Sequence, residues 1–276
     1  MHAKNKNDKN IAGEIVSFFR FSFGTIITGQ FAVVIIPLLL LWEVVPRLHL
    51  FSRNLFPTFS DCASAFEHLL LHSNLMGHIG LSVFFFLIGL ILSVITAVPT
   101  GILLGWNPAL RKYFMPVFQI LAPIPPTAWV PIALIFLGVG FPLRVFLVYL
   151  SSFFPIFLNT FQAIKDTDRR YVLSARVFGA SELNILIHVH FYHALGAILM
   201  SIRTGISIGL IMLTAAEMYG VNGGLGFLLV HSKEFFRIPD MVVCMAVLGF
   251  IGWFLTEIIK YLEKRICLWK ESRQEA

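Results

Sequence analysis

The sequence has 276 residues, of which 57% are hydrophobic and 13% are charged, whereas about 25% of the residues in a soluble domain are charged. The net charge of +6 would suit a nucleic-acid-binding protein, but membrane proteins also collect basic residues, on their cytoplasmic side. A membrane-spanning helix needs about 20 apolar residues. The sequence therefore predicts an all-α polytopic membrane protein, because Asp, Glu, Lys and Arg are missing from four long stretches, 21–42, 68–110, 113–143 and 145–164.

Residues 1–25 precede the first predicted span and begin with a polar, basic segment. We expect a cytoplasmic tail here, in which Ile11, Ile15 and Phe18 recur at helical spacing. This short stripe fits an interfacial helix on the membrane surface, and equally an extension of the first span. The apolar stretch that follows is longer than the core of a signal peptide and lacks a convincing cleavage site, so the first span is expected to be retained.

Six spans are predicted within a transmembrane domain of residues 26–262, which is followed by a cytoplasmic tail at 263–276. They are expected at 26–45, 79–104, 117–139, 143–164, 194–216 and 241–261. Basic residues cluster before the first span and after the second, fourth and sixth. With six spans these clusters fall on one side, which predicts that both termini are cytoplasmic. A seventh span would place the two basic ends on opposite sides.

The third predicted span contains four prolines close together, Pro123, Pro125, Pro126 and Pro131. Proline removes a backbone donor and blocks the bond to the carbonyl four residues earlier. Lipid cannot satisfy the carbonyls that are left over, so the segment must face protein or a water-filled cavity. A kinked, buried helix would meet this requirement. We favour a helix that lines a solute path, because so many prolines exceed what a kink requires.

Arg144, Arg203 and Glu217 are among the charged residues within or beside the predicted spans, where charges are usually functional or interfacial. Arg144 lies near the outer end of the fourth span, from which its charge can reach the surface. Arg203 and Glu217 are separated by about 21 Å of helix, so they cannot pair on that helix. Glu217 is a candidate for the path or its gate, and a structural hydrogen bond is the alternative.

Two motifs that suggest chemistry have simpler interpretations. The glycine-rich segment GVNGGLG at 220–226 lacks the Lys-Ser/Thr of a Walker A loop and is expected to form a tight turn. No Walker A motif occurs anywhere in the chain, so ATP would have to be bound by another polypeptide. In HVHFYH, only His190 and His193 share a helical face, which is too few ligands for a metal. The three cysteines, Cys62, Cys244 and Cys267, are too widely spaced for a zinc site. We therefore predict no cofactor, no metal and no enzymatic activity for this chain.

The loop at 165–192, between the fourth and fifth spans, contains a segment that resembles a known docking element. LSARVFGASELNILIHVHFYHAL, at 173–195, is similar to the EAA loop of ABC importer permeases, E-A-A-x3-G-x9-I-x-L-P. Ala175 and Gly179 match the second alanine and the glycine, whereas Leu173 and Tyr192 replace the glutamate and the proline. Three further segments resemble permeases of the nitrate/sulfonate/taurine/bicarbonate importer family in order and spacing: LAPIPPTAWVPIALIFLGVG, FFPIFLNTFQAI and AAEMYGVNGGLGFLL.

The resemblance implies a type I importer permease with the MetI-like fold, in a bacterial inner membrane. Its partners would be a second, identical permease copy, a cytoplasmic ATPase dimer that binds Mg-ATP, and an extracytoplasmic solute-binding protein. It also implies an ATPase-docking helix that contains Ser174, Ala175, Arg176, Gly179, Ala180 and Ser181. The solute would be nitrate, a sulfonate, taurine, bicarbonate or a similar small molecule.

Three alternatives remain open at this point. The docking helix could be an ordinary surface helix. The chain could be an ATP-independent secondary transporter or channel, although such proteins often contain inverted repeats and we find no convincing similarity between residues 20–140 and 141–260. A membrane scaffold is the third alternative, but it would not explain the proline-rich span or the docking segment.

Overall fold

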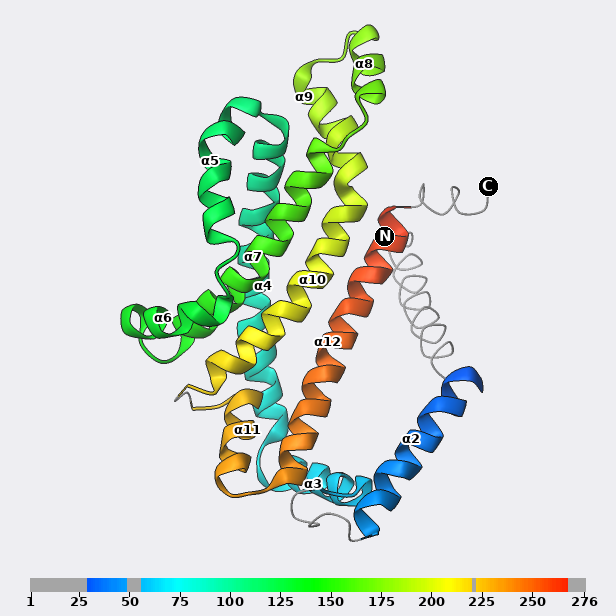
Figure 1. Cartoon of the computed structure of the whole chain (residues 1–276), viewed down its shortest axis with the longest axis vertical. Helices are drawn as coiled ribbons and strands as arrows, with labels where there is room; N and C mark the ends of the chain where they lie inside the picture. Colours follow the sequence, from blue (N-terminus) through cyan, green and yellow to red (C-terminus); the bar gives the residue numbers. More distant parts are fainter. Residues whose placement is uncertain (1–28, 49–55, 220–221, 268–276) are drawn as a thin grey trace, which may run out of the picture. The chain divides into compact units, whose positions relative to one another are not determined.

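The computed structural model describes residues 29–48, 56–219 and 222–267 (Figure 1). The chain divides into two compact units, residues 1–66 and 67–276. The described residues form helices, turns and short irregular segments and contain no strand, which confirms the all-α prediction. The predicted interfacial helix within 1–25, and residues 268–276 of the predicted C-terminal tail, lie outside the described residues.

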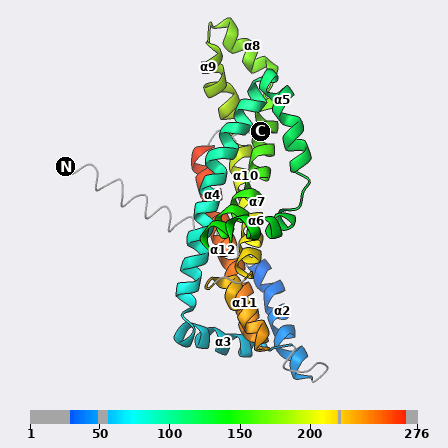
Figure 2. The same ribbon diagram turned by 90° about the vertical axis from the view of Figure 1, so that its left-hand side faces the viewer.

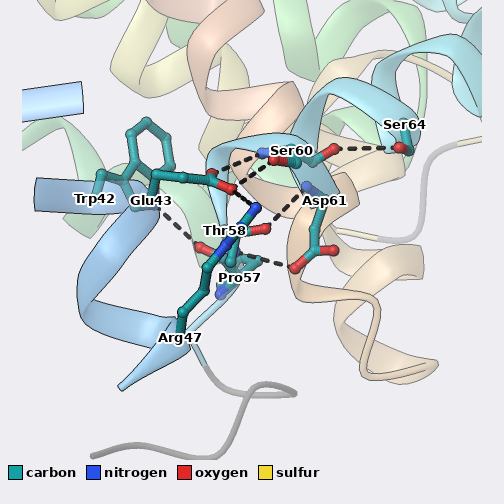
Figure 3. Close-up of polar contacts among 8 residues, drawn as sticks. All are labelled: Trp42, Glu43, Arg47, Pro57, Thr58, Ser60, Asp61 and Ser64. Carbon is teal, nitrogen blue, oxygen red and sulfur yellow. Dashed lines mark hydrogen bonds and ion pairs between the residues drawn. The ribbon is translucent and has the colours of Figure 1, made fainter. Parts of the chain in front are cut away.

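The first unit contains helix α2 (Gly29–Arg47) and the first turns of helix α3 (Phe59–His72). Side chains near the end of α2 connect these two helices (Figure 3). The Glu43 carboxylate accepts hydrogen bonds from the Ser60 backbone N–H at 3.2 Å and from the Ser60 hydroxyl at 2.6 Å. The Trp42 indole N–H donates to the Pro57 carbonyl at 3.1 Å. Helix α2 overlaps the first predicted span, 26–45, from residue 29 onward.

Helix α3 is an amphipathic helix that was not predicted, because 14 residues are too few for a span. A reciprocal pair of hydrogen bonds starts it: the Thr58 N–H donates to Asp61, and the Asp61 N–H donates to the Thr58 hydroxyl, both at 3.1 Å. Its buried residues Cys62, Ala65 and Leu69 recur at helical spacing. This spacing was the available signal for the helix.

The second unit is built on four long helices: α4 (Leu75–Trp106), α7 (Phe141–Lys165), α10 (Tyr192–Glu217) and α12 (Ile238–Ile266) (Figures 1 and 2). By length and composition, four helical stretches can cross a membrane, Leu75–Trp106, Phe141–Lys165, Glu182–Glu217 and Ile238–Ile266. They correspond to the second, fourth, fifth and sixth predicted spans. Helix α7 is central, because 56% of its most apolar window is buried, against 17–39% in the other three.

The third predicted span, 117–139, is not one helix. Helix α5 (Pro108–Leu121) ends before the prolines, and a short 3-10 helix, η1 (Pro126–Trp129), leads into helix α6 (Val130–Leu137). The chain bends by 85° between the two halves. A proline at the start of a helix is tolerated, because the N–H that it lacks would have no partner in the first turn. A proline inside a helix breaks the hydrogen bonding. The prolines of this segment therefore divide the span into separate helices.

Helices α4 and α7 pack unusually closely because α4 presents a row of small residues. These residues recur every fourth position and are all buried: Gly89, Ser93, Ala97, Gly101 and Gly105. A Cβ on Gly101 would lie 2.8 Å from Cβ of Thr160 and 2.9 Å from the carbonyl oxygen of Phe157. The Ser93 hydroxyl donates to the Tyr149 carbonyl across the same interface, at 2.7 Å. Small residues at this spacing let two helix backbones approach within a membrane, where the hydrophobic effect does not drive association.

We predict opposite effects for the same substitution at two glycines of α4. Gly101→Ala should lower the free energy of unfolding by about 1–3 kcal/mol, because the added methyl group overlaps the α7 backbone. Gly80→Ala has no atom within 4 Å of the new methyl group and should raise stability by up to about 1 kcal/mol through helix propensity. Thermal unfolding of the purified variants in detergent measures both. Equal shifts at the two positions would contradict the close packing of α4 on α7.

Candidate functional site

The loop between α7 and α10 folds into a helix–turn–helix at one end of the second unit, opposite α11 (Leu225–Glu234) (Figures 1 and 2). Helix α8 (Arg169–Val177) starts at Asp168, whose carboxylate accepts from the Arg170 N–H at 2.9 Å. Helix α9 (Glu182–Ile185) starts at Ser181, whose hydroxyl accepts from the Asn184 N–H at 3.4 Å. Side-chain caps of this kind hold the ends of short helices.

Gly179 forms the turn between α8 and α9. Its φ of +77° is in the left-handed region, which favours glycine. The Gly179 N–H donates to the Arg176 carbonyl at 2.9 Å, and the Ala180 N–H donates to the Ala175 carbonyl at 3.0 Å. These two bonds are those of a Schellman motif, which ends a helix and satisfies its last carbonyls. No atom lies within 4 Å of a Cβ built on Gly179, so within this chain the glycine is required by the backbone conformation.

The tip of this loop exposes apolar side chains. Phe178 is 89% exposed, the highest value among the large hydrophobic residues that the structure describes, and Val177 is 84% exposed. Arg176 and Glu182 form an exposed ion pair at 2.9 Å across the turn. Exposed apolar residues beside charged ones are typical of a protein-interaction site. Sequence reasoning missed Val177 and Phe178, although two apolar residues directly before a helix-ending glycine are visible in the sequence.

The structure brings the six residues of the predicted docking helix together in this one loop. Ser174, Ala175 and Arg176 lie in α8, whereas Gly179 and Ala180 form the turn and Ser181 caps α9. Ala175 and Ala180 are half-buried, and the other four are exposed.

The four prolines of the third predicted span lie in and around the break between α5 and α6. Pro123, Pro125 and Pro131 are exposed, and Pro126 is half-buried. Helix α6 packs through Val130 and Ala133 against α7 and α10. Its opposite face exposes Ile135 and Phe136. The break therefore holds one face of α6 against the bundle and presents the prolines and the other face outward, to lipid, solute or another chain.

Glu217 is separated from the prolines and lies in a polar cluster that joins α4, α10 and α11. It is 1% exposed. The Ser82 hydroxyl lies 2.7 and 2.9 Å from the two carboxylate oxygens, and the Gly226 N–H donates to the carboxylate at 2.9 Å. The Leu225 N–H donates to the Ser82 oxygen at 2.9 Å. Together these bonds occupy the first N–H groups of α11, where a helix favours negative charge. Glu217 therefore makes structural hydrogen bonds, which was the alternative to a role in the path or its gate.

His78, Gly224 and Arg144 complete the surroundings of Glu217. His78 Nδ1 accepts from the Gly224 N–H at 3.0 Å, which extends the cluster by one further N–H of the same turn. Gly224 has a φ of +108°, and a side chain there would overlap the Glu217 carboxyl group. Arg144 is buried near Glu217, and its guanidinium lies 4.4 Å from the centre of the Phe85 ring. The residues of GVNGGLG that the structure describes, 222–226, thus form the predicted turn and the start of α11.

The histidines His188, His190 and His193 do not form a common cluster. His188 contacts the Asn184 carbonyl of its own helix, and His190 contacts the Ile164 carbonyl at the end of α7. In the part of the chain that the structure describes, no three His, Cys, Asp or Glu side chains are placed to hold a metal ion.

Residues 97–266 match the family of binding-protein-dependent transport system inner membrane components. The chain belongs to this family. Among curated proteins, it is 28% identical to the taurine transport system permease protein of Escherichia coli K12 over 240 residues, which are 84% of this chain and 86% of that protein. It is 32% identical to the bicarbonate transport system permease protein of a Synechocystis strain over 180 residues, which are 64% of each chain.

A solved structure of the MetNI methionine ABC transporter in inward-facing conformations contains a similar chain. The TM-score is 0.57 and the identity is 14%, over 67% of this chain and 92% of that chain. This likeness confirms the expected MetI-like permease fold. The family match confirms that the chain is a multi-pass permease component of the ABC importer type.

We predict that Ser82→Ala destabilises the second unit by about 1–3 kcal/mol, because it leaves Leu225 N–H without its acceptor and removes a donor to a buried carboxylate. Ser207→Ala is the matched control, since the Ser207 hydroxyl bonds only to the Arg203 carbonyl one turn earlier on an exposed face. Thermal unfolding in detergent distinguishes the two. An equal, small effect of both substitutions would show that the Glu217 cluster does not hold α11.

Proposed function

We propose that this chain forms, together with a second and identical copy, the translocation path of an ABC importer for a small solute with an anionic group. Nitrate, sulfonates, taurine and bicarbonate are the solutes in question. A separate ATPase dimer would bind Mg-ATP and drive transport, and an extracytoplasmic binding protein would deliver the solute. The family supports these partners, and the solute class rests on relatives named for taurine and bicarbonate transport.

The exposed tip of the α8–α9 loop is the observation that carries the ATPase proposal. A nine-residue helix, capped at both ends and followed by a tight turn, presents Val177 and Phe178 to a partner. Apolar side chains that anchor in a partner's pocket contribute most of the energy of an interface. The Arg176–Glu182 ion pair and the turn at Gly179 would keep the anchor in one orientation. The loop and both termini would then lie on the cytoplasmic side of a bacterial inner membrane.

The proline break is the proposed lining of the path, with Pro123, Pro125, Pro126 and Pro131 facing it. The exposed prolines lie where backbone carbonyls are not all used in helix bonds, so a water-filled path would satisfy them. Glu217 is proposed as part of the outer gate, through its hold on the start of α11 and not through direct contact with the solute. An ATP-independent transporter remains the alternative function, and the ATPase association decides between them.

The docking proposal predicts that Phe178→Ser abolishes co-purification of the ATPase while membrane insertion stays normal. Phe178 is at the surface, so its loss removes an anchor without disturbing the fold. Phe236→Ser is the control, because Phe236 is 81% exposed at the turn between α11 and α12. The measurement is a pull-down in mild detergent, with ATPase activity assayed in the eluate. Co-purification that survives Phe178→Ser would contradict docking at this tip.

Gly179→Arg is predicted to abolish both ATPase association and uptake, since arginine strains the backbone at a positive φ and adds bulk at the tip. Gly179→Asn tolerates the same φ and should retain much of the association. Loss in Gly179→Arg and retention in Gly179→Asn would show that the turn accepts a small side chain that tolerates its φ. Normal uptake by Gly179→Arg would refute a role of this loop in docking.

The path proposal predicts that single cysteines at Pro123, Pro125 and Pro131 react with aqueous thiol reagents in at least one state of the transport cycle. Cysteines at Ile91 and Ile95, exposed on α4, are expected to face lipid and to react slowly. Labelling of intact membranes with and without ATP and vanadate measures the rates. Proline-site cysteines that stay unreactive in both states would remove the break from the path.

A further inference from the structure

The α8–α9 loop leaves the bundle at the end of α7, and a contact at the carbonyl group of Ile164 connects its two ends. Ile164 is fully buried in the last turn of α7 and packs against Gly105 of α4. Its carbonyl oxygen accepts from the Thr167 hydroxyl at 2.9 Å and contacts His190 Nδ1 at 3.3 Å. His190 lies 26 residues further along the chain, where the loop rejoins the bundle. This contact closes the base of the loop.

His190 lies in a π-helix, η2 (Leu186–Phe191), between α9 and α10. Such segments are rare and occur frequently at functional sites, because the wider turn changes the face on which the following side chains lie. From Glu182 to Glu217 the helical segments are continuous, so a displacement of α9 can pass directly to α10. The other end of the loop connects to α7 through a bend at Asp166–Asp168. Helices α7 and α10 already pack against each other along the bundle, and the contact at Ile164 adds a polar connection between them at the end nearest the loop.

We propose that His190 is a positioning residue that makes α7 and α10 move together when the α8–α9 loop is displaced. This inference rests on the proposed function, in which a docked ATPase moves the loop. A carbonyl oxygen only accepts, so the imidazole must carry its proton on Nδ1 and donate it to Ile164. The neighbouring His188 makes no such connection, because it contacts the Asn184 carbonyl of its own helix at 3.2 Å. The two histidines therefore form a natural comparison.

The test uses the complex of the full chain with its ATPase in proteoliposomes, and two reporters at the ends of the helices remote from the loop. A single cysteine replaces Phe141 at the start of α7, or Tyr219 just after α10; both positions are half exposed. The rate of reaction with a membrane-impermeant maleimide is measured without nucleotide and with ATP and vanadate. This readout requires no knowledge of the solute.

With His190 present, nucleotide should change the labelling rate several-fold at both reporters. His190→Leu should preserve ATPase association and the response at Tyr219→Cys, but lose most of the response at Phe141→Cys. His190→Asn places an amide donor near the position of Nδ1 and should restore the Phe141→Cys response. His188→Leu should behave as the unsubstituted chain does. A purely structural role of His190 would not separate the two reporters.

Three outcomes would overturn the inference. A full response at both reporters in His190→Leu would show that α7 and α10 are coupled without this contact. Loss of both responses would show that His190 supports the whole loop and does not act on α7. Failure of the unsubstituted complex to respond to nucleotide, or to bind an ATPase at all, would overturn the proposed function, and this inference with it.

Discussion

The close contact of α4 with α7 is the constraint on which the rest of the second unit depends. Side chains on α4 are reduced to glycine, serine or alanine at every fourth position from 89 to 105, and α7 fills the resulting groove with Val148, Thr160 and Ile164. Because α7 lies this close to α4 on one side, its other side is available to α10, where the Ser152 hydroxyl donates to the Gly205 carbonyl at 2.9 Å. A three-helix core of α4, α7 and α10 results, and α6, α11 and α12 are added to it.

A membrane bundle must also satisfy the polar groups that its breaks and turns expose, and here buried side chains do so. The first N–H groups of α11 have no preceding helical turn whose carbonyls could accept their hydrogen bonds, and lipid supplies no acceptor. Glu217, Ser82 and His78 take up three successive N–H groups, from Gly224 to Gly226, and they come from two different helices. The same bonds that satisfy α11 therefore also fix α4 against α10. A further ion pair, between Arg203 and Glu263, joins α10 to α12 nearer the other end.

Prediction from the sequence succeeded where long-range contacts were not needed. The sequence located all four long helices, because charge-free runs marked α4 and α7 and shorter apolar stretches marked α10 and α12. The proline cluster indicated a broken third span, but not that the two halves would bend by 85°. Helix α11 was not predicted, because the start of this helix is held by the side chains of Ser82 and Glu217. These two residues are 135 positions apart in the chain, so no local pattern shows the contact. The π-helix was missed because it differs from an α-helix only in its hydrogen bonds. Glycine at 179 was singled out from the sequence, although its backbone conformation was not foreseen.

The α8–α9 loop combines a stiff tip with a closed base, and these two properties have different physical origins. The tip is stiffened by short-range bonds: Asp168 caps the start of α8, the turn at Gly179 ends it, and Ser181 caps the start of α9. At the base, a contact joins Ile164 and His190, which are 26 positions apart. A force applied at Phe178 would deform the tip little and would reach the base. Because a bundle packed as tightly as α4 on α7 cannot deform continuously, such a force would move whole helices relative to one another. In the proposed mechanism, the base of the loop would therefore decide which helices move, and the tip would only receive the force.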